Sequence, residues 1–253
     1  MSSALLLSME SKPIPALRLA QSVGIRTVIA YAHRFGIEEK IPAYLPVALG
    51  AAELTLLEHT SAFSTFPNDG LRATPRYILR VTDYDGRLLE HDYPSVHDVI
   101  SEHTARVMTS MLREVVLHGT AVAANRLKYP VAGKTGTTND FTDAWFIGFS
   151  PSLTCGVWVG FDEKKTLGNK ETGAMADLPI WMDFMATALP RQHNNGDFRE
   201  PAEEVTRALT RKNADLPVHD KTGRVVLAIQ ASDAHVNPAS QRNAEPSVSP
   251  QAH

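Results

Sequence analysis

The chain has 253 residues, of which 43% are hydrophobic, and its formal net charge at pH 7 is −3. A chain of this length can bury a sizeable core, and we interpret it as one domain followed by a tail. A nearly neutral charge without a long basic stretch gives no support to a nucleic-acid partner. No run reaches the ~20 apolar residues of a membrane-spanning helix, and residues 1–12 lack the pattern of a signal peptide.

Three helices are predicted in the first quarter of the chain. Apolar residues recur with helical spacing in residues 14–23 and again in residues 28–35, and a glycine follows each pattern. A third helix is predicted from Thr55 to about Phe66. Thr55 and Glu58 have the spacing of a capping box, in which the hydroxyl and the carboxylate each bind a free amide at the helix start.

A β-hairpin and a longer helix are predicted next. The segment Asp83-Tyr84-Asp85-Gly86 separates two apolar strands, and an Asp-Gly pair supplies the positive φ that a tight turn needs. Ser101 can cap a helix that ends at His118-Gly119. The residues of this helix that are expected to face the core are Val107, Met108, Met111, Leu112 and Val115.

Three antiparallel strands are predicted at residues 131–138, 144–149 and 155–159, because such short connections cannot cross over to make parallel pairs. Cys155 has no second cysteine to pair with, and its apolar surroundings predict a buried thiol that packs as a small hydrophobe. Pro179 suits the first turn of a final helix. The predicted core face of that helix is Trp181, Phe184, Met185 and Ala188.

The first of these strands carries the chemistry of the chain. The stretch Val131-Ala132-Gly133-Lys134-Thr135-Gly136-Thr137-Thr138 places a cation and hydroxyls between glycines, as a site for an anionic, carbonyl-bearing ligand requires. Its Gly133-Lys134-Thr135 also matches the end of a P-loop, but that pattern needs glycine where Lys128 stands and a helix where a strand is predicted. We therefore do not predict a nucleotide site.

The same stretch and its surroundings resemble the transpeptidase domain of class A, bifunctional penicillin-binding proteins. K-T-G is a signature that these proteins share with class A β-lactamases. The resemblance extends over residues 104–112, His118-Gly119-Thr120-Ala121, residues 132–138, 143–148 and 156–162. It implies an α+β fold, the penicillin-binding-protein/β-lactamase-like transpeptidase fold with an antiparallel sheet flanked by helices, here N-terminally truncated.

The resemblance also implies a role for each residue of the motif. Lys134 would border the hydrogen-bond network of the nucleophile, and the hydroxyls of Thr135 and Thr137 would bind the carboxylate of a peptide or a β-lactam. The amide of Thr137 would form half of the oxyanion hole. Gly136 would allow close approach of the ligand, and Thr138 completes the substrate-binding set. No metal and no other cofactor is implied.

A second family motif, Ser-x-Asn, resembles Ser11-Lys12-Pro13, which makes Ser11 a candidate catalytic residue that shuttles a proton. The alternative for Ser11 is a hydroxyl at a helix entry. Pro13 stands in place of the asparagine and has neither a side-chain amide nor an N–H, so the contact with the substrate amide is lost.

The family nucleophile is the serine of an S-x-x-K motif, and no serine of this sequence has a lysine three positions further on. Loss of the catalytic serine alone costs a serine hydrolase on the order of 10⁶ in turnover. We therefore expect the chain to be inactive by itself.

In the complete enzyme, the resemblance implies acyl transfer from D-alanyl-D-alanine stem peptides during peptidoglycan cross-linking, and binding of β-lactams. Family members are anchored in the inner membrane with this domain on the periplasmic face of the cell envelope. The expected partner is the missing N-terminal half of the same protein. Two alternatives stay open: a β-lactamase- or carboxypeptidase-like serine hydrolase, and a non-catalytic remnant or one half of a split enzyme.

Domain boundaries follow from the resemblance and from composition. We predict a partial transpeptidase domain at residues 1–190, a C-terminal extension with short strands at residues 191–231, and a disordered tail at residues 232–253. A second copy of the tripeptide, Lys221-Thr222-Gly223, is followed by Arg224 and is interpreted as a turn between short strands.

Overall fold

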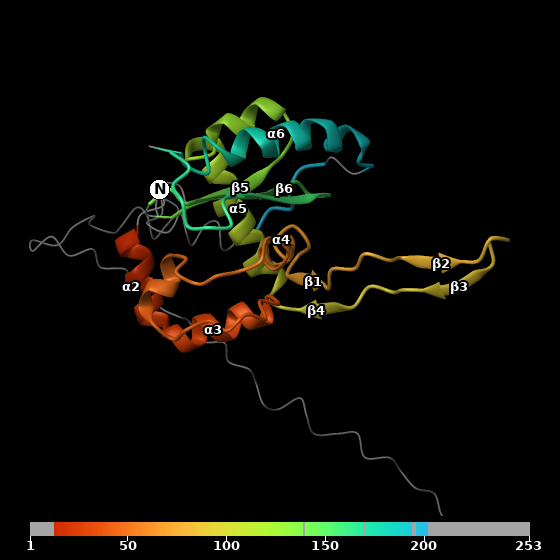
Figure 1. Ribbon diagram of the computed structural model, residues 1–253, viewed down its shortest axis with the longest axis horizontal. Helices are drawn as coiled ribbons and strands as arrows, with labels where there is room; N and C mark the ends of the chain where they lie inside the picture. The colour runs from red at the N-terminus through yellow and green to blue at the C-terminus, as the bar shows by residue number, and fades with distance from the viewer. Residues whose placement is uncertain (1–12, 139, 169–170, 194–195, 202–253) are drawn as a thin grey trace, which may run out of the picture. The chain divides into compact units, whose positions relative to one another are not determined.

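The computed structural model describes residues 13–138, 140–168, 171–193 and 196–201. The chain divides into two units, Met1–Asp215 and Leu216–His253, and all described residues belong to the first. Its helices are α2 (Pro13–Val23), α3 (Ile25–Arg34), η1 (Leu45–Leu49), α4 (Leu56–Ser64), α5 (Glu102–His118), η2 (Val122–Leu127), α6 (Asp177–Ala188) and η3 (Leu189–Arg191) (Figure 1). Its strands are β1 (Leu71–Ala73), β2 (Arg80–Thr82), β3 (Leu88–His91), β4 (Val96–Asp98), β5 (Ala132–Thr137), β6 (Asp143–Phe149) and β7 (Thr154–Gly160).

The main sheet has three antiparallel strands in the order β5-β6-β7. Thr135 lies opposite Phe146, and Phe146 lies opposite Val157, so these three residues share one face of the sheet. The register confirms the prediction of three consecutive antiparallel strands. β5 stands at the end of the order, so one of its edges is paired with no strand in the part of the chain that the structure describes.

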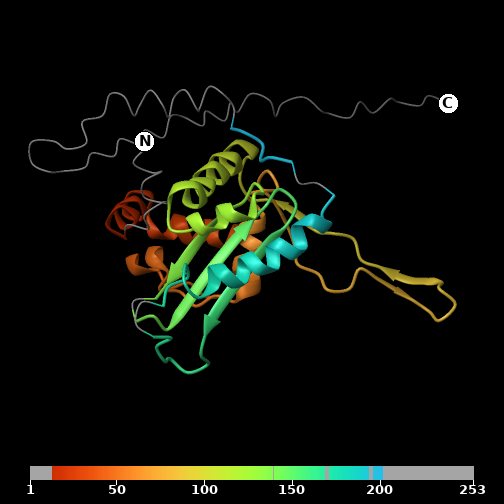
Figure 2. The ribbon, with the colours of Figure 1, turned by 90° about the horizontal axis from the view of Figure 1, so that it is seen from above.

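Helices cover both faces of this sheet, α4 on one face and α6 on the other (Figures 1 and 2). A Cβ on Gly156 of β7 would meet Thr60 of α4, whereas a Cβ on Gly148 of β6 would meet Trp181 of α6. Helix α5 packs against β5. Helices packed around an antiparallel sheet form the α+β arrangement that the sequence predicted.

Aromatic side chains fill both interfaces. On the α6 side, Trp181 packs edge to face on Phe146 with ring centroids 4.9 Å apart, and its Nε1 donates a hydrogen bond to the carbonyl of Cys155 over 3.0 Å. The Cys155 side chain packs against this cluster, and burial raises the pKa of its thiol to about 11. A protonated thiol in apolar surroundings agrees with the packing role that the sequence indicated. On the α4 side, Phe149 contacts Phe66 and Phe198.

The predicted helices near the start of the chain are confirmed within the described residues. Helices α2 and α3 are separated by Gly24, whose φ of 89° few other residues adopt. The capping box of α4 is present. The Thr55 hydroxyl accepts the Glu58 amide over 3.2 Å, and the Glu58 carboxylate accepts the Thr55 amide over 3.2 Å.

Two predicted core faces are partly wrong. In α5 the buried residues are Ala105, Thr109, Leu112, Val115 and Val116, so Val107, Met108 and Met111 are displaced from the face that packs inward. Small residues at positions 105 and 109 allow the helix to approach its neighbours closely, and a pattern based on side-chain size misses them. In α6 the side chain of Phe184 is 51% exposed, because Leu178, Trp181 and Met185 already define the inward face.

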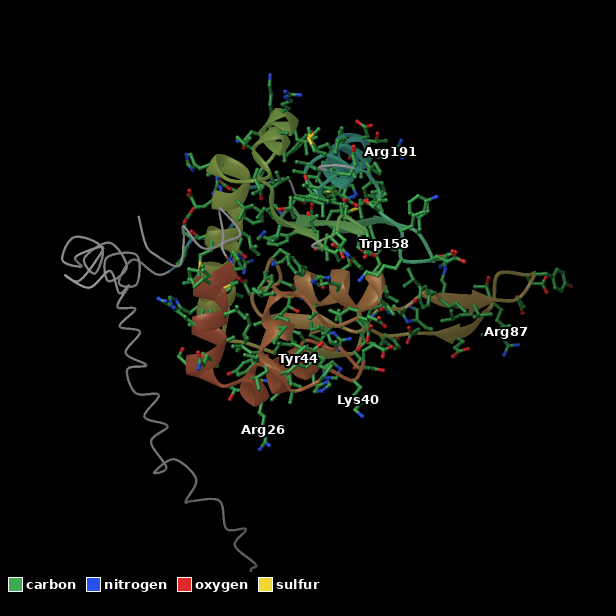
Figure 3. The ribbon with its side chains drawn as sticks, turned by 60° about the vertical axis from the view of Figure 1, so that its left-hand side comes forward. Arg26, Lys40, Tyr44, Arg87, Trp158 and Arg191 are labelled. Atoms are coloured by element: carbon green, nitrogen blue, oxygen red, sulfur yellow. The ribbon has the colours of Figure 1, made fainter. Side chains whose placement is uncertain are left out.

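Two small antiparallel pairs lie outside the main sheet. The predicted hairpin is present as β2 and β3, and it extends from a second pair, β1 with β4, which the sequence did not predict (Figures 1 and 2). Every residue of β2 and β3 is exposed. Figure 3 shows side chains projecting from both sides of this ribbon, with Arg87 near its tip.

Several predictions fall on residues that the structure does not describe. Ser11, the second tripeptide at Lys221-Thr222-Gly223 and the predicted tail at residues 232–253 all lie outside the described residues. Within the described ranges, no helix combines the length and hydropathy needed to span a membrane.

Candidate functional site

The candidate site is the open edge of β5. Thr138 donates its amide to the carbonyl of Asp143 over 3.0 Å, and the direction of the backbone groups alternates along an antiparallel strand. The register therefore points the backbone groups of Lys134 and Gly136 toward β6, and those of Thr135 and Thr137 toward the open edge. Exposure increases along the strand, from buried Gly133 to exposed Thr137, so this edge becomes accessible at the motif.

Lys134 is a largely desolvated cation on the same face of the sheet as Trp145. Burial lowers the pKa of its ammonium group to about 8, because a charged group loses hydration there. Its Nζ donates a hydrogen bond to the carbonyl of Thr135 over 2.9 Å. Lys134 thus brings a positive charge to the edge of the strand.

The Thr135 hydroxyl lies 2.9 Å from the hydroxyl of Thr120. Thr120 follows Gly119, the residue that caps the end of α5, and the backbone on each side of it is fixed. The amides of Gly119 and Ala121 both donate to the carbonyl of Val115, over 3.0 and 3.2 Å. The end of α5 therefore places a second hydroxyl beside the motif.

The Thr137 hydroxyl accepts a hydrogen bond from the amide of Gly173 over 3.1 Å. A Cβ on Gly173 would lie 2.7 Å from the carbonyl oxygen of Gly136 and 2.3 Å from that of Trp145, so only glycine fits so close to the sheet. Because this bond uses a lone pair of Thr137, the proton of its hydroxyl stays available for another acceptor.

Thr138 organises the turn between β5 and β6. Its hydroxyl accepts the amides of Thr142 and Asp143, over 3.0 and 2.9 Å. The Thr142 hydroxyl lies 2.9 Å from it and donates to the carboxylate of Asp143 over 2.7 Å. Asp143 also accepts a hydrogen bond from Nε1 of Trp158, a residue labelled in Figure 3, over 3.1 Å. This network holds the end of the motif in one geometry.

An aromatic pair borders the motif on its α4 side. Trp145 lies opposite Gly136, and the His59 ring lies 5.6 Å from the Trp145 ring. A Cβ on Gly136 would lie 3.1 Å from the Cβ of Trp145, so glycine keeps the edge of the strand uncrowded. Burial lowers the pKa of His59, which keeps this imidazole neutral at pH 7.

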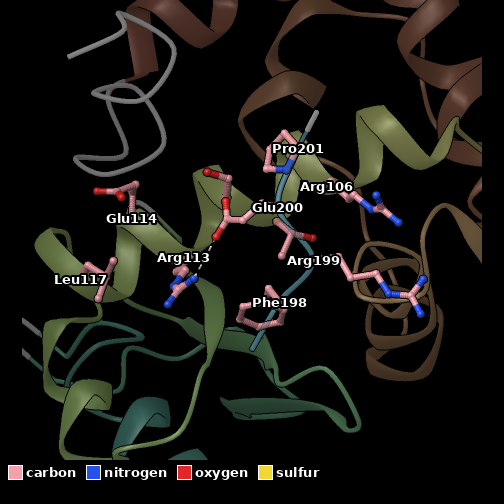
Figure 4. Close-up of a pocket in the computed structure, with 10 residues that line it drawn as sticks. Arg106, Arg113, Glu114, Leu117, Phe198, Arg199, Glu200 and Pro201 are labelled. Carbon is pink, nitrogen blue, oxygen red and sulfur yellow. Dashed lines mark ion pairs between the residues drawn. The ribbon is translucent and has the colours of Figure 1, made fainter. Parts of the chain in front are cut away.

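A pocket of about 240 Å³ lies between α5 and residues 198–201 (Figure 4). Arg113 pairs with Asp197 over 3.1 Å and with Glu200 over 3.6 Å. Arg106 pairs with Asp69 over 3.0 Å. The guanidinium groups that line the pocket are thus held by carboxylates, and its lining includes no residue of β5. We do not count it as part of the candidate site.

The structure brings five of the six predicted site residues together on one strand and its following turn: Lys134, Thr135, Gly136, Thr137 and Thr138. The sixth, Ser11, lies outside the described residues. Thr120 and Gly173, which had no predicted role, contact the motif from other parts of the chain. Thr120 stands within the family-like His118-Gly119-Thr120-Ala121 frame, which was the one signal available for it. Among the described residues, no group of acidic, histidine or cysteine side chains has the geometry of a metal site.

Comparison with known proteins gives consistent results. Residues 6–177 match the family model described as the penicillin binding protein transpeptidase domain. Penicillin-binding protein 1A of Aquifex aeolicus is 40% identical over 223 residues, which are 87% of this chain and 30% of that protein. Penicillin-binding protein 1A of Neisseria gonorrhoeae is 37% identical over 193 residues, which are 74% of this chain and 24% of that protein.

A solved structure has a similar fold. The crystal structure of penicillin-binding protein 1A from Haemophilus influenzae superimposes with a TM-score of 0.73 at 28% sequence identity, covering 78% of this chain and 36% of that chain. The chain thus spans about a third or less of the length of these relatives. It belongs to the family of penicillin-binding protein transpeptidase domains, among the class A proteins.

Proposed function

We propose that this chain holds the ligand-recognition part of a D,D-transpeptidase site that acts in peptidoglycan cross-linking. The ligand is the carboxylate end of a D-alanyl-D-alanine stem peptide, or of a β-lactam that resembles it. The observation that carries the proposal is the open edge of β5, where the desolvated Lys134 and the hydroxyls of Thr135 and Thr137 lie along one strand. This geometry suits an extended ligand that lies along the strand.

Charge and hydrogen-bond donors support carboxylate recognition. Lys134 is the cation of the motif, and the hydroxyl proton of Thr137 is available because its oxygen accepts from Gly173. Hydrogen bonds that involve a charged partner contribute about 1.5–3 kcal/mol each, roughly twice a neutral one. In our proposal Lys134 and the two hydroxyls therefore account for most of the binding free energy of the carboxylate.

The amide of Thr137 supplies one donor of the oxyanion hole. It points toward the open edge in the register of β5 with β6, away from the carbonyls of β6. A preorganised amide stabilises the oxyanion of a tetrahedral intermediate because it needs no reorientation during the reaction. The second donor would come from the nucleophile segment, as in the family pattern.

Thr138 stabilises the turn after β5 and does not donate its hydroxyl proton to the ligand. Thr142 uses its own proton on Asp143, so the bond between Thr138 and Thr142 consumes the proton of Thr138. In our proposal Thr138 fixes the position of Thr137, and it gives no hydrogen bond to the substrate carboxylate.

The proposal includes inactivity of this chain alone. Acyl transfer needs a nucleophile, and the sequence contains no S-x-x-K motif. Ser11 remains the candidate for the proton shuttle, and Pro13 cannot make the amide contact of the asparagine it replaces. A complete site would need the nucleophile from another part of a class A protein, held at the cell envelope. We favour a transpeptidase over a β-lactamase-like hydrolase because the curated relatives are penicillin-binding proteins 1A.

Binding of benzylpenicillin and of its methyl ester, followed by calorimetry on the full chain, tests the proposal. We expect the acid to bind at least about ten-fold more tightly than the ester, because the ester removes one charged hydrogen-bond acceptor. Thr135→Val should reduce that preference. Thr82→Val on the exposed ribbon, which removes a comparable hydroxyl far from the motif in sequence, should leave it unchanged. Equal affinity for acid and ester would contradict the proposal.

A further inference from the structure

We infer that Thr120 is a positioning residue that directs the hydroxyl proton of Thr135 toward the ligand carboxylate; this inference rests on the proposed function. The two hydroxyl oxygens lie 2.9 Å apart, within hydrogen-bond distance. Thr120 belongs to the turn after α5, while Thr135 belongs to β5. The contact therefore links two elements that are separate in the chain.

The number of hydroxyl protons in this pair shows that one donor stays available. Thr120 and Thr135 together carry two protons, and the bond between their oxygens uses one of them. Within the part of the chain that the structure describes, neither hydroxyl has a further hydrogen-bond partner. One proton of the pair is therefore left for a ligand. If Thr120 donates to Thr135, the remaining proton belongs to Thr135, whose oxygen lies on the motif itself.

The second hydroxyl pair near the motif behaves in the opposite way. Thr138 and Thr142 also lie 2.9 Å apart, but Thr142 donates to the carboxylate of Asp143. Both protons of that pair are consumed inside the turn. The pair of Thr138 and Thr142 therefore stabilises the turn, whereas the pair of Thr120 and Thr135 has one hydroxyl proton available for a ligand.

The backbone holds Thr120 in place while its side chain stays exposed. Gly119 and Ala121 both donate to the carbonyl of Val115, and Ala121 is completely buried in the cluster around Trp181. Because this backbone is already fixed, forming the hydrogen bond orders only the side chain of Thr120. Without Thr120, the Thr135 hydroxyl would have no partner in the described part of the chain to orient it, and ordering it at the moment of binding would lower the affinity for the ligand.

The hydrogen bond has a defined direction when an anion is present. A carboxylate accepts hydrogen bonds and cannot donate them, so it selects the arrangement in which Thr135 donates outward and accepts from Thr120. An ester has no full negative charge and selects this arrangement less strongly. The contribution of Thr120 should therefore appear in the preference for acid over ester, and only weakly in the affinity for the ester.

A double-mutant cycle on the full chain tests this role with benzylpenicillin and its methyl ester as probes. Thr120→Val should lower the acid-over-ester preference about three- to ten-fold, the loss expected for one neutral hydrogen bond. Thr120→Ser keeps the hydroxyl and should restore the preference to within about two-fold. Combined with Thr135→Val, Thr120→Val should cause no further loss, because Thr120 acts through the hydroxyl that Thr135→Val has removed.

Thr104→Val is the matched control, because Thr104 forms a hydroxyl pair with Ser101 over 2.8 Å at the other end of α5. It should not change the preference. If wild type binds acid over ester and Thr120→Val preserves that preference, the inference is overturned and the proposed function stands. If the losses of the two single variants multiply in the double variant, Thr120 contacts the ligand by itself and the positioning role is wrong. If wild type shows no preference, the proposed function fails and this inference fails with it.

Discussion

The sheet β5–β7 with its helices and the ribbon β2–β3 are both antiparallel, yet they are held together in different ways. The largest fully buried side chains of the described residues come mainly from β6 and α6 and include Trp181, Phe146 and Phe149. The ribbon buries none of its residues, and Tyr84 at its turn is 97% exposed. Packing from two sides fixes the strands of the sheet, whereas the ribbon depends on its own backbone pairing and turn.

This difference explains where recognition chemistry can be placed. Donors that bind a carboxylate must keep their positions before the ligand arrives, because reorganisation costs affinity. β5 is braced by β6, by α5 and by the glycine contact from Gly173. A two-stranded ribbon that buries no side chain cannot hold donors to that precision, since isolated hairpins are only marginally stable in water.

The largest expected effect is on the packing of the sheet. Trp181→Ala should destabilise the chain by about 3–5 kcal/mol, because it removes a fully buried indole and leaves a cavity beside Phe146. Leu89→Ala on the ribbon, where the side chain is 62% exposed, should change stability by no more than about 0.5 kcal/mol. Urea unfolding measures both. Similar losses for the two variants would remove the contrast between the regions.

The buried ammonium group of Lys134 should lower the stability of the folded chain. Its pKa in the folded chain is about 8, below the ordinary value of 10.5, so between these pH values the unfolded chain binds more protons and stability rises with pH. Lys134→Met should therefore stabilise the chain by about 1–3 kcal/mol at pH 7, and the advantage should shrink toward pH 10. Arg87→Met on the ribbon is the control. Urea unfolding of the Lys134 variant at pH 7 and pH 10 decides the point, and a pH-independent difference would contradict it.

Substitutions at Gly148 and Gly86 compare the stability cost of overpacking with that of backbone strain. A Cβ on Gly148 would lie 2.7 Å from the Trp181 ring and 2.8 Å from the Phe146 ring, so Gly148→Ala should cost about 1–3 kcal/mol through overpacking. Gly86 in the ribbon turn has open space around it but a φ of 82°, so Gly86→Ala should cost about 1 kcal/mol through strain alone. Thermal unfolding should rank Gly148→Ala as the more damaging change. The reverse order would mean that the sheet adapts more readily than its packing indicates.

The smallest effect concerns the turn that follows the motif. Thr138→Val removes the acceptor of two backbone amides and should destabilise the chain by about 1–2 kcal/mol. It should also weaken binding of the acid less than Thr135→Val does, because Thr138 only positions its neighbour. Thr82→Val on the ribbon should leave both quantities near wild type. Calorimetric titration of the Thr138 variant checks the order, and a loss larger than that of Thr135→Val would restore Thr138 as a direct ligand.

Local patterns predicted most of the secondary structure. The capping box of Thr55 and Glu58, the Asp85-Gly86 turn and the short loops between the last three strands each depend on residues close in sequence, and each is present. The long frame around Lys134 predicted the family, because a frame of that length constrains a sheet and its helices together. K-T-G alone would not have done so, since the chain contains it twice.

What the sequence missed depends on long-range contacts. The β1–β4 pair joins two three-residue strands with no pattern of their own, Leu71–Ala73 and Val96–Asp98. The buried carboxyl of Asp177, whose pKa burial raises to about 7, occupies the start of α6 without any signal in the sequence. The contacts of Thr120 with Thr135 and of Gly173 with Thr137 join exposed or small residues from separate elements, and hydrophobic periodicity carries no information on such contacts.

The most direct test of the account is intact-mass measurement of the purified chain after incubation with a labelled penicillin, using a preparation that binds the acid in preference to its ester. We predict that the mass stays unchanged, both for wild type and for Ser11→Ala, because the chain has the residues for recognition without the S-x-x-K nucleophile. A stoichiometric adduct on the wild-type chain, lost in Ser11→Ala or mapped to another serine, would contradict this prediction and would mean that this chain carries a complete acyl-transfer site of its own.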